Sequence, residues 1–181
     1  VPDAVVLPVA YGDALSGVYR GFKELLQAGL IARIPRLFAA ETFPSLSGAL
    51  ATDSPSPVAT RGGPSRSMSV ATPTGTYQSL RAIRESEGGA VPVSDGETAR
   101  AHADLRRSGL LVEFSSAMPL AAVRRLVADG ELHRDDRVVL VITSSGLKDL
   151  ELTGETEEAP LVEANLASLS AELARRFAFR A

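Results

Sequence analysis

The chain has 181 residues, of which 45% are hydrophobic, 23% charged and 5% aromatic. This composition suits one well-packed domain or one lobe of a larger protein, and it excludes a disordered or collagen-like chain. A net charge of −3 argues against a general nucleic-acid-binding surface, and the absence of cysteine excludes disulfides and thiolate metal sites. The sequence has no run of about eighteen uncharged apolar residues, so we expect no membrane span. Its first residues lack the pattern of an export signal, so we expect a cytoplasmic protein.

Apolar runs and amphipathic segments alternate along the first part of the chain. Residues 4–10 form a continuous, β-branched run that is typical of a strand buried on both faces. Residues 36–42 predict a second strand, and residues 44–51 a short helix after it. Between the two strands, one helical stripe is apolar, and it consists of Val18, Phe22, Leu25, Leu26 and Leu30. This order of strand, helix, strand and helix predicts a parallel sheet.

The middle of the chain begins with a change in composition. Residues 52–68 are rich in proline, glycine and serine, which indicates a flexible surface loop or connector. A helix within residues 75–88 and a short strand at 89–94 follow. Ser94 and Glu97 form a capping box, so a further helix begins there and ends near Gly109.

The remaining pattern predicts two more strands and two more helices. Residues 110–114 are predicted as a strand, and residues 136–146 as the clearest buried strand of the chain. The intervening helix is expected to direct four apolar residues inward, namely Leu120, Val123, Leu126 and Val127. The end of the chain predicts an amphipathic helix that packs on this lobe or on a neighbouring subunit, with Val162, Leu166, Leu169, Leu173 and Phe177 on one face. The predicted fold class is α/β, with a mainly parallel open sheet and helices on both faces.

Small polar residues follow several predicted strands, where ligands bind in open α/β sheets. After the first strand, backbone N–H groups from Gly12 to Ser16 suit a phosphate, whereas the alternative is that Asp13 merely caps the helix. After the last strand, the hydroxyls of Thr143, Ser144 and Ser145 suit a ring nitrogen or a carbonyl, and the alternative is that they merely form a turn with Gly146. Two histidines offer too little for a histidine-based metal centre.

Taken together, the ordered segments resemble a known family. They are PDAVVLPVAYGDALSGVYRGFKELLQAGLIARIPRLFAAE, TYQSLRAIRESEGGAVPVSD, VEFSSAMPLAAV and DDRVVLVITSSGLKD. They are similar to the second half of threonine synthase and, more broadly, to the fold type II pyridoxal-phosphate enzymes related to tryptophan synthase β. The resemblance covers residues 1–150 as the C-terminal part of a cofactor-binding domain, and it leaves residues 151–181 as a C-terminal extension.

The resemblance implies a cofactor, pyridoxal 5′-phosphate, and residues that bind it. Its phosphate would lie on the backbone of Ala10, Tyr11, Gly12, Asp13 and Ala14, although family loops usually carry several glycines where this loop has only Gly12. Thr143 would be the hydroxyl partner of the pyridine nitrogen. Glu113 would have an auxiliary role at the cofactor cleft, or it is a buried structural carboxylate.

The resemblance also implies an enzyme whose machinery is incomplete within this chain. It would be a lyase or synthase that acts on an amino acid with a β- or γ-leaving group. The Schiff-base lysine lies in the first half of such enzymes, whereas Lys23 and Lys148 lack that context and are predicted to be solvated charges. For Lys148 the alternative is a place beside the active site.

We therefore expect the missing N-terminal half as part of the same chain or as a second chain, and a homo-oligomer. The segment SVATPTGTYQ lacks the arginine and asparagine that follow the corresponding region of threonine synthases, which widens the choice of amino-acid substrate. The alternative function is a catalytically silent binding or assembly domain derived from this fold.

Overall fold

The structure is a computed structural model that describes residues 1–148 and 160–178. Its centre is a four-stranded sheet in the order β3-β2-β1-β4. Every strand pair is parallel, and the strands are β1 (Ala4–Val9), β2 (Arg36–Glu41), β3 (Gly89–Pro92) and β4 (Val138–Leu140). The predicted α/β class with an open parallel sheet is confirmed.

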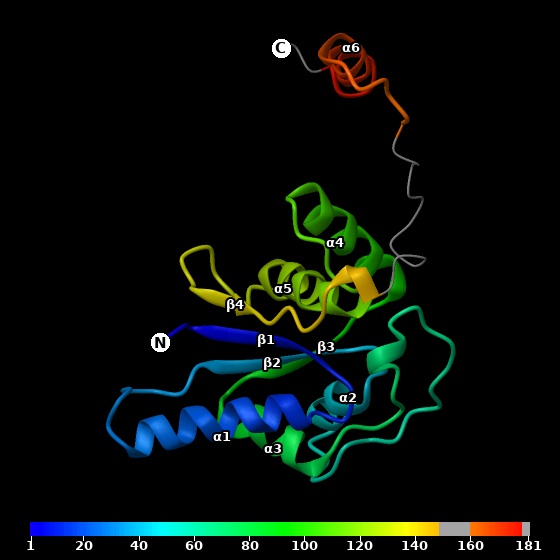
Figure 1. Ribbon diagram of the computed structural model, residues 1–181. Helices are drawn as coiled ribbons and strands as arrows, with labels where there is room; N and C mark the ends of the chain where they lie inside the picture. Colours follow the sequence, from blue (N-terminus) through cyan, green and yellow to red (C-terminus); the bar gives the residue numbers. More distant parts are fainter. Residues whose placement is uncertain (149–159, 179–181) are drawn as a thin grey trace.

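Helices cover both faces of the sheet (Figure 1). One face carries α1 (Asp13–Gln27), α2 (Ser45–Ala51) and α3 (Tyr77–Glu85). The other face carries α4 (Asp95–Arg107) and α5 (Met118–Ala128). Side chains of β1 alternate between the two cores, with Val5 and Leu7 against the first layer and Ala4 and Val6 against the second. Because both faces are covered, β1 is buried along its whole length, as its apolar run predicts.

The ends of α4 follow the predicted capping pattern. The Ser94 side chain accepts a hydrogen bond from the backbone N–H of Glu97, and the Glu97 carboxylate accepts one from the backbone N–H of Ser94. The helix ends at Arg107, and Gly109 takes a left-handed φ of +88° just beyond it. Both ends of this helix are therefore set by local sequence.

The predicted strand at residues 110–114 is wrong. In the structure Val112 makes one isolated antiparallel bridge with Ser145, and Phe114 opens a short 3-10 helix, η2 (Phe114–Ala117). The reason lies in α4: the buried His102 donates from Nε2 to the Val112 carbonyl oxygen at 2.9 Å, and its ring contacts Phe114. The His102 side chain thus bonds the carbonyl group that a neighbouring strand would otherwise bond, while Val112 and Phe114 are buried in the core.

The predicted burial of the last strand is also wrong. β4 is only three residues long and pairs with β1 on one side, and no strand among the described residues pairs with its other edge. Val139 is 46% exposed and Ile142 is 39% exposed. The apolar character that suggested deep burial is therefore left on an open sheet edge in the described part of the chain.

The predicted helical stripes are only partly buried. The buried residues of α1 are Leu15 and Tyr19, whereas three residues of its predicted stripe are exposed, namely Leu25, Leu26 and Leu30. Val127 in α5 is 50% exposed, so its predicted inward direction is wrong. These positions lie toward or beyond the C-terminal ends of helices, past the area that the small sheet covers.

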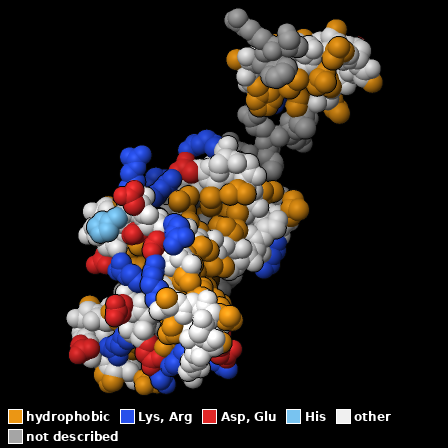
Figure 2. Space-filling model, turned by 90° about the vertical axis from the view of Figure 1, so that its left-hand side faces the viewer, with side chains coloured by type: hydrophobic (Ala, Val, Ile, Leu, Met, Phe, Trp, Pro, Cys, Tyr) orange, Lys and Arg blue, Asp and Glu red, His pale blue; other side chains and the backbone are white. Residues whose placement is uncertain are grey.

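The C-terminal helix α6 (Leu166–Phe177) begins after Val162, so the prediction that Val162 belongs to this helix is wrong. None of its residues is buried, and hydrophobic side chains are visible on its surface (Figure 2). Figure 1 places it apart from the sheet and its helical layers. Packing on this lobe is therefore not seen among the described residues, and packing on a neighbouring subunit stays a prediction. Within the described ranges, no helix combines the length and apolarity that crossing a membrane requires.

The loop over residues 52–68 has no helix before η1 (Met68–Val70), but α4 holds its end in place. The carboxylate of Asp95 accepts hydrogen bonds from Ser65 Oγ at 2.7 Å and from the Arg66 backbone N–H at 2.9 Å. The Arg66 guanidinium also lies 4.3 Å from the centre of the Phe114 ring. These contacts place the residues after the loop beside η2.

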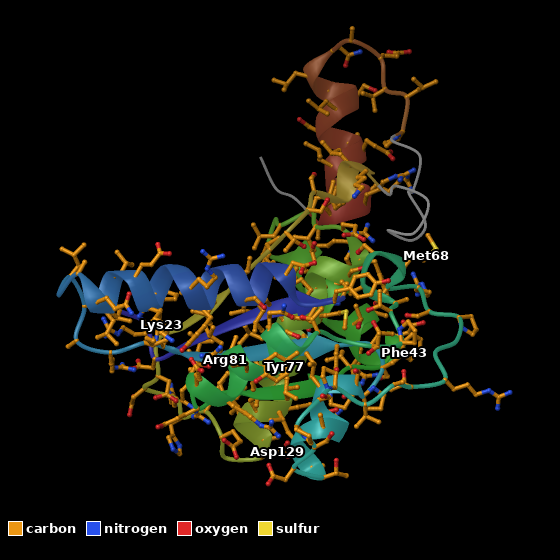
Figure 3. All side chains as sticks on the ribbon, turned by 90° about the horizontal axis from the view of Figure 1, so that it is seen from below. Lys23, Phe43, Met68, Tyr77, Arg81 and Asp129 are labelled. Atoms are coloured by element: carbon orange, nitrogen blue, oxygen red, sulfur yellow. The ribbon has the colours of Figure 1, made fainter. Side chains whose placement is uncertain are left out.

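A charged cluster joins α1 to α3 on the outer face of their layer. The Glu85 carboxylate accepts hydrogen bonds from the Tyr19 hydroxyl, from Arg81 Nε at 2.5 Å and from Lys23 Nζ at 3.2 Å. Figure 3 shows Lys23 and Arg81 on this side of the molecule. The Tyr19 hydroxyl, followed by the Arg81 guanidinium, lowers the pKa of Glu85 from 4.5 to about 2. Lys23 is thus a surface charge with an acidic partner.

The low pKa of Glu85 predicts an acid-dependent contribution to stability. A carboxylate whose pKa is lower in the folded state stabilises the fold above its unfolded pKa, and this contribution disappears as the pH falls through the folded value. We expect Glu85→Gln to lower the free energy of unfolding near neutral pH, and the difference from wild type to shrink between about pH 5 and pH 2. Urea unfolding at a series of pH values measures it. Glu24→Gln on α1 is the control, because Glu24 has no ion pair in the described structure. The same pH dependence in both variants would contradict the assignment.

Candidate functional site

The connections of the sheet create a switch point between β1 and β4. From β1 the chain proceeds outward through β2 to β3, and it then returns to place β4 on the other side of β1. The helix that follows β1 covers one face, and the helix that precedes β4 covers the other. The segments that leave these two neighbouring strands therefore separate at the carboxyl edge, where open α/β sheets bind ligands.

A cleft of about 340 Å³ lies at this edge. It is lined by every residue that the sequence nominated for the cofactor, namely Ala10, Tyr11, Gly12, Asp13, Ala14, Glu113 and Thr143. The other residues that line it include Ser69, Val70, Ser144 and Lys148. The structure thus brings four separate segments together around one cavity.

The turn between β1 and α1 requires glycine at position 12. Gly12 has a φ of +100°, and a Cβ there would lie 2.2 Å from the Cβ of Ser79. Ser79 belongs to the first turn of α3, and the backbone N–H of Thr76 at the cap of that helix donates to the Tyr11 carbonyl oxygen at 2.9 Å. The start of α3 therefore packs directly against the turn. A side chain at position 12 is excluded both by backbone conformation and by space.

The N-terminus of α1 opens into the cleft. The helix begins at Asp13, the cap position is Gly12, and no side chain of the described residues caps it. The idea that Asp13 caps this helix is therefore wrong, because Asp13 is its first residue. Backbone N–H groups in the first turn of a helix have no partner within the helix, and together with the helix dipole they favour an anion.

Glu113 forms the floor of the cleft on the side of η2. Its side chain is buried, and Oε1 accepts hydrogen bonds from Ser69 Oγ and Ser115 Oγ, both at 3.1 Å. Its backbone N–H donates to the Ser144 carbonyl oxygen at 3.0 Å. Among the described residues, none donates to Oε2. Glu113 is therefore both held in place by its neighbours and able to accept one more hydrogen bond.

Thr143 also lines the cleft, and its side chain is exposed. Its Oγ1 is 2.9 Å from Ser116 Oγ, which also accepts a hydrogen bond from the Ser144 backbone N–H at 3.0 Å. The predicted turn lies two residues after Thr143. There Ser145 Oγ accepts a hydrogen bond from the Leu147 N–H at the start of η3 (Gly146–Lys148). The turn and the cleft thus use different hydroxyls, and the two alternatives for this segment are compatible.

Sequence reasoning missed three residues of this arrangement. Ser69 lies in the SVAT segment, and the available signal was that a substrate-shaping region follows the matching segment in threonine synthases. Lys148 lines the cleft, whereas its sequence context favoured a solvated charge over a place beside the active site. Ser116 gave no signal of its own, because a serine within a run of small residues is common in turns and helices.

Comparison with known proteins decides the family. Residues 1–144 match the family described as pyridoxal-phosphate dependent enzyme. This chain belongs to that family. It is 34% identical to a threonine synthase from Methanosarcina acetivorans over 92% of this chain and 42% of that protein. It is 30% identical to a threonine synthase from Methanocaldococcus jannaschii over 89% of this chain and 41% of that protein. The chain thus spans about two fifths of the length of these relatives.

Solved structures agree on the fold. A threonine deaminase from Solanum lycopersicum superposes with a TM-score of 0.64 at 20% identity, over 88% of this chain and 45% of that chain. A fungal L-serine ammonia-lyase from Rhizomucor miehei gives a TM-score of 0.65 at 21% identity, over 84% of this chain and 49% of that chain. At this level of identity the similarity establishes the fold alone, which is the large-domain architecture of fold type II.

The residues present fit the cofactor of this family. Pyridoxal phosphate carries an anionic phosphate and, at another position of its ring, a pyridine nitrogen. The cleft offers the open N-terminus of α1 beside Gly12 and, on another wall, the hydroxyl of Thr143. Both ends of the ligand would therefore meet groups of matching chemistry.

The Gly12 turn predicts a large difference between two glycines that lie five positions apart. Gly12→Ala is expected to destabilise the fold by about 1–3 kcal/mol, because of its left-handed φ and its approach to Ser79. Gly17→Ala, at a helical position with nothing within 4 Å of the added Cβ, is expected to be stabilising by about 0.5–1 kcal/mol. Thermal and urea unfolding of the protein that contains this chain measure both. Equal effects of the two variants would show that the turn tolerates a side chain.

Proposed function

We propose that this chain forms the cofactor-holding part of a pyridoxal-phosphate-dependent lyase or synthase that acts on an amino acid with a β- or γ-leaving group. One observation carries the proposal: the open N-terminus of α1 and the hydroxyl of Thr143 line the same cleft at the switch point of the sheet. Membership of the pyridoxal-phosphate-dependent family supplies the cofactor. When bound, pyridoxal phosphate acts as an electron sink for bonds to the substrate Cα.

In this proposal the backbone of the β1–α1 turn holds the phosphate. The N–H groups at Asp13 and Ala14 point from the first turn of α1, and Ala10, Tyr11 and Gly12 bring the chain to the cleft. The Asp13 carboxylate adds negative charge beside this position. Lys148 lines the same cleft and supplies a positive charge that offsets it.

Thr143 and Glu113 face the remaining parts of the cofactor. A neutral hydroxyl such as that of Thr143 leaves a pyridine nitrogen largely unprotonated, which suits elimination and replacement better than transamination. Glu113 accepts hydrogen bonds from Ser69 and Ser115 through one oxygen, and its other oxygen is available to a ligand. We assign it an auxiliary role in orienting the bound molecule.

The lysine that carries the cofactor is proposed to lie outside these 181 residues. Lys23 lies on the face of α1 and α3 with Glu85 as its partner, and it is not among the residues that line the cleft. Lys148 lines the cleft, and we assign it a role as a charge. This assignment makes a second segment or chain necessary for the reaction.

Among possible reactions, the threonine synthase relatives favour loss of a γ-phosphate together with addition of water at the β-carbon. In that reaction O-phosphohomoserine and water give threonine and phosphate. The departure in the segment SVATPTGTYQ keeps other amino acids with leaving groups in the proposal, because Ser69 and Val70 of that segment line the cleft.

A homo-oligomer in the cytoplasm belongs to the same proposal. The open edge of β4 exposes Val139 and Ile142, and α6 exposes hydrophobic side chains. Apolar surface of this kind favours association with another chain or another segment. The mass of the native protein in solution tests this part.

Reduction with borohydride tests where the cofactor is attached. Borohydride converts a lysine–cofactor imine into a stable adduct, which a mass spectrum of the digested protein then locates. We expect the native protein to carry one such adduct on a lysine outside the 181 residues, with Lys23 and Lys148 unmodified. An adduct on Lys148 would contradict the proposed division of roles.

Product analysis separates the reactions. Threonine and phosphate from O-phosphohomoserine would support the replacement, whereas ammonia and a 2-oxo acid from serine or threonine would support an elimination. A native protein that binds no pyridoxal phosphate and forms no adduct would support the silent binding domain instead.

A further inference from the structure

A buried hydroxyl lies directly behind Thr143. Ser116 in η2 is completely buried, and its Oγ is 2.9 Å from Thr143 Oγ1. The same oxygen accepts a hydrogen bond from the backbone N–H of Ser144 at 3.0 Å. Ser116 itself is not among the residues that line the cleft. It therefore acts on any ligand in the cleft only through its neighbours.

The direction of the hydrogen bond between the two hydroxyls follows from what each can donate. A serine hydroxyl has one hydrogen and two lone pairs, and the Ser144 N–H occupies one lone pair of Ser116. Because Ser116 is buried, its hydrogen needs a protein acceptor, and among the described residues Thr143 Oγ1 is the acceptor within reach. If Thr143 donated instead, the hydrogen of Ser116 would remain in the interior without a partner.

We propose that Ser116 is a positioning residue that donates to Thr143 Oγ1 and thereby directs the Thr143 hydrogen into the cleft. Thr143 then presents a donor to the ligand. A donor at this place selects an unprotonated pyridine nitrogen and disfavours a protonated one, which has no lone pair to offer. This inference rests on the contact between Thr143 and the cofactor in the proposed function, and it adds the group that sets the polarity of that contact.

The backbone around Thr143 is held independently of the Ser116 hydroxyl. The Glu113 N–H donates to the Ser144 carbonyl oxygen and the Gly146 N–H donates to the Leu111 carbonyl oxygen, both at 3.0 Å. These two bonds fix the segment after β4 against the segment before η2. Removal of the Ser116 hydroxyl therefore changes the direction of the Thr143 hydroxyl more than its position.

The test is the ring-nitrogen signal of bound pyridoxal phosphate that is labelled with ¹⁵N, recorded in the complete native protein. We expect Ser116→Ala to move this signal in the same direction as Thr143→Ala, because both variants remove a directed donor. We also expect Ser116→Ala to weaken cofactor binding about three- to tenfold, the effect of one misdirected hydrogen bond. Absorbance titration with pyridoxal phosphate measures the binding.

Ser86→Ala is the matched control. Ser86 is also buried, and its Oγ accepts from the Leu37 N–H at 3.2 Å and donates to the Ile83 carbonyl oxygen at 3.1 Å. Like Ser116, it accepts from a backbone N–H and donates to an oxygen, but neither of its partners lines the cleft. We expect it to lower the melting temperature as Ser116→Ala does, with no change in the ¹⁵N signal.

The outcomes distinguish this inference from the function on which it rests. If Thr143→Ala moves the ¹⁵N signal and Ser116→Ala does not, Ser116 is merely structural and the inference is wrong, while the proposed function stands. If the native protein binds no pyridoxal phosphate, both are wrong. Should Ser116→Ala fail to fold, Ser116→Cys decides, because its thiol is a weaker donor of similar shape and predicts a signal between those of wild type and Thr143→Ala.

Discussion

The parallel pairing of β1 with β4 is the constraint on which the rest of the site depends. Only this pairing places the turn at Gly12 beside the segment at Thr143, although the two are far apart in sequence. Ala4 to Val6 of β1 pair in register with Val138 to Leu140 of β4, so both strands end at the same edge of the sheet. Because the helices next to these strands cover opposite faces, the described elements leave a cleft between them.

The cleft holds its residues through short, local hydrogen bonds. Glu113 directly precedes η2, and Ser116 lies within it. One carboxylate oxygen of Glu113 accepts hydrogen bonds from Ser69 and Ser115, and the Ser116 hydroxyl is hydrogen-bonded to Thr143. Phe114, between them, is buried against Arg66 and His102. Packing thus fixes the middle of this turn. Glu113 lines the cleft directly, whereas Ser116 contacts Thr143, which lines it.

The sequence was sufficient wherever the physical cause of a structure is local. The capping box of Ser94 and Glu97 and the β-branched run of β1 each contain their own explanation, and the structure confirms both. The sequence-based prediction failed at residues 110–114, because the hydrogen bond from His102 to the Val112 carbonyl depends on packing between separate elements. Strand ends and family resemblance together nominated residues that all line one cleft. The sequence did not indicate the role of Ser116, because its partner Thr143 is 27 residues away along the chain and serine and threonine hydroxyls are common.

The charges that line the cleft explain why anion binding there depends more on the N-terminus of α1 than on any single side chain. Asp13 and Glu113 line the cleft, and among the described lining residues Lys148 is the basic one. Side chains alone therefore make this a poor place for an anion. Backbone N–H groups of α1 supply the compensating positive potential without a titratable group, and their alignment is fixed by the helix itself. A phosphate held in this way depends on the conformation of Gly12, since that residue determines where the helix begins and how closely α3 packs behind it.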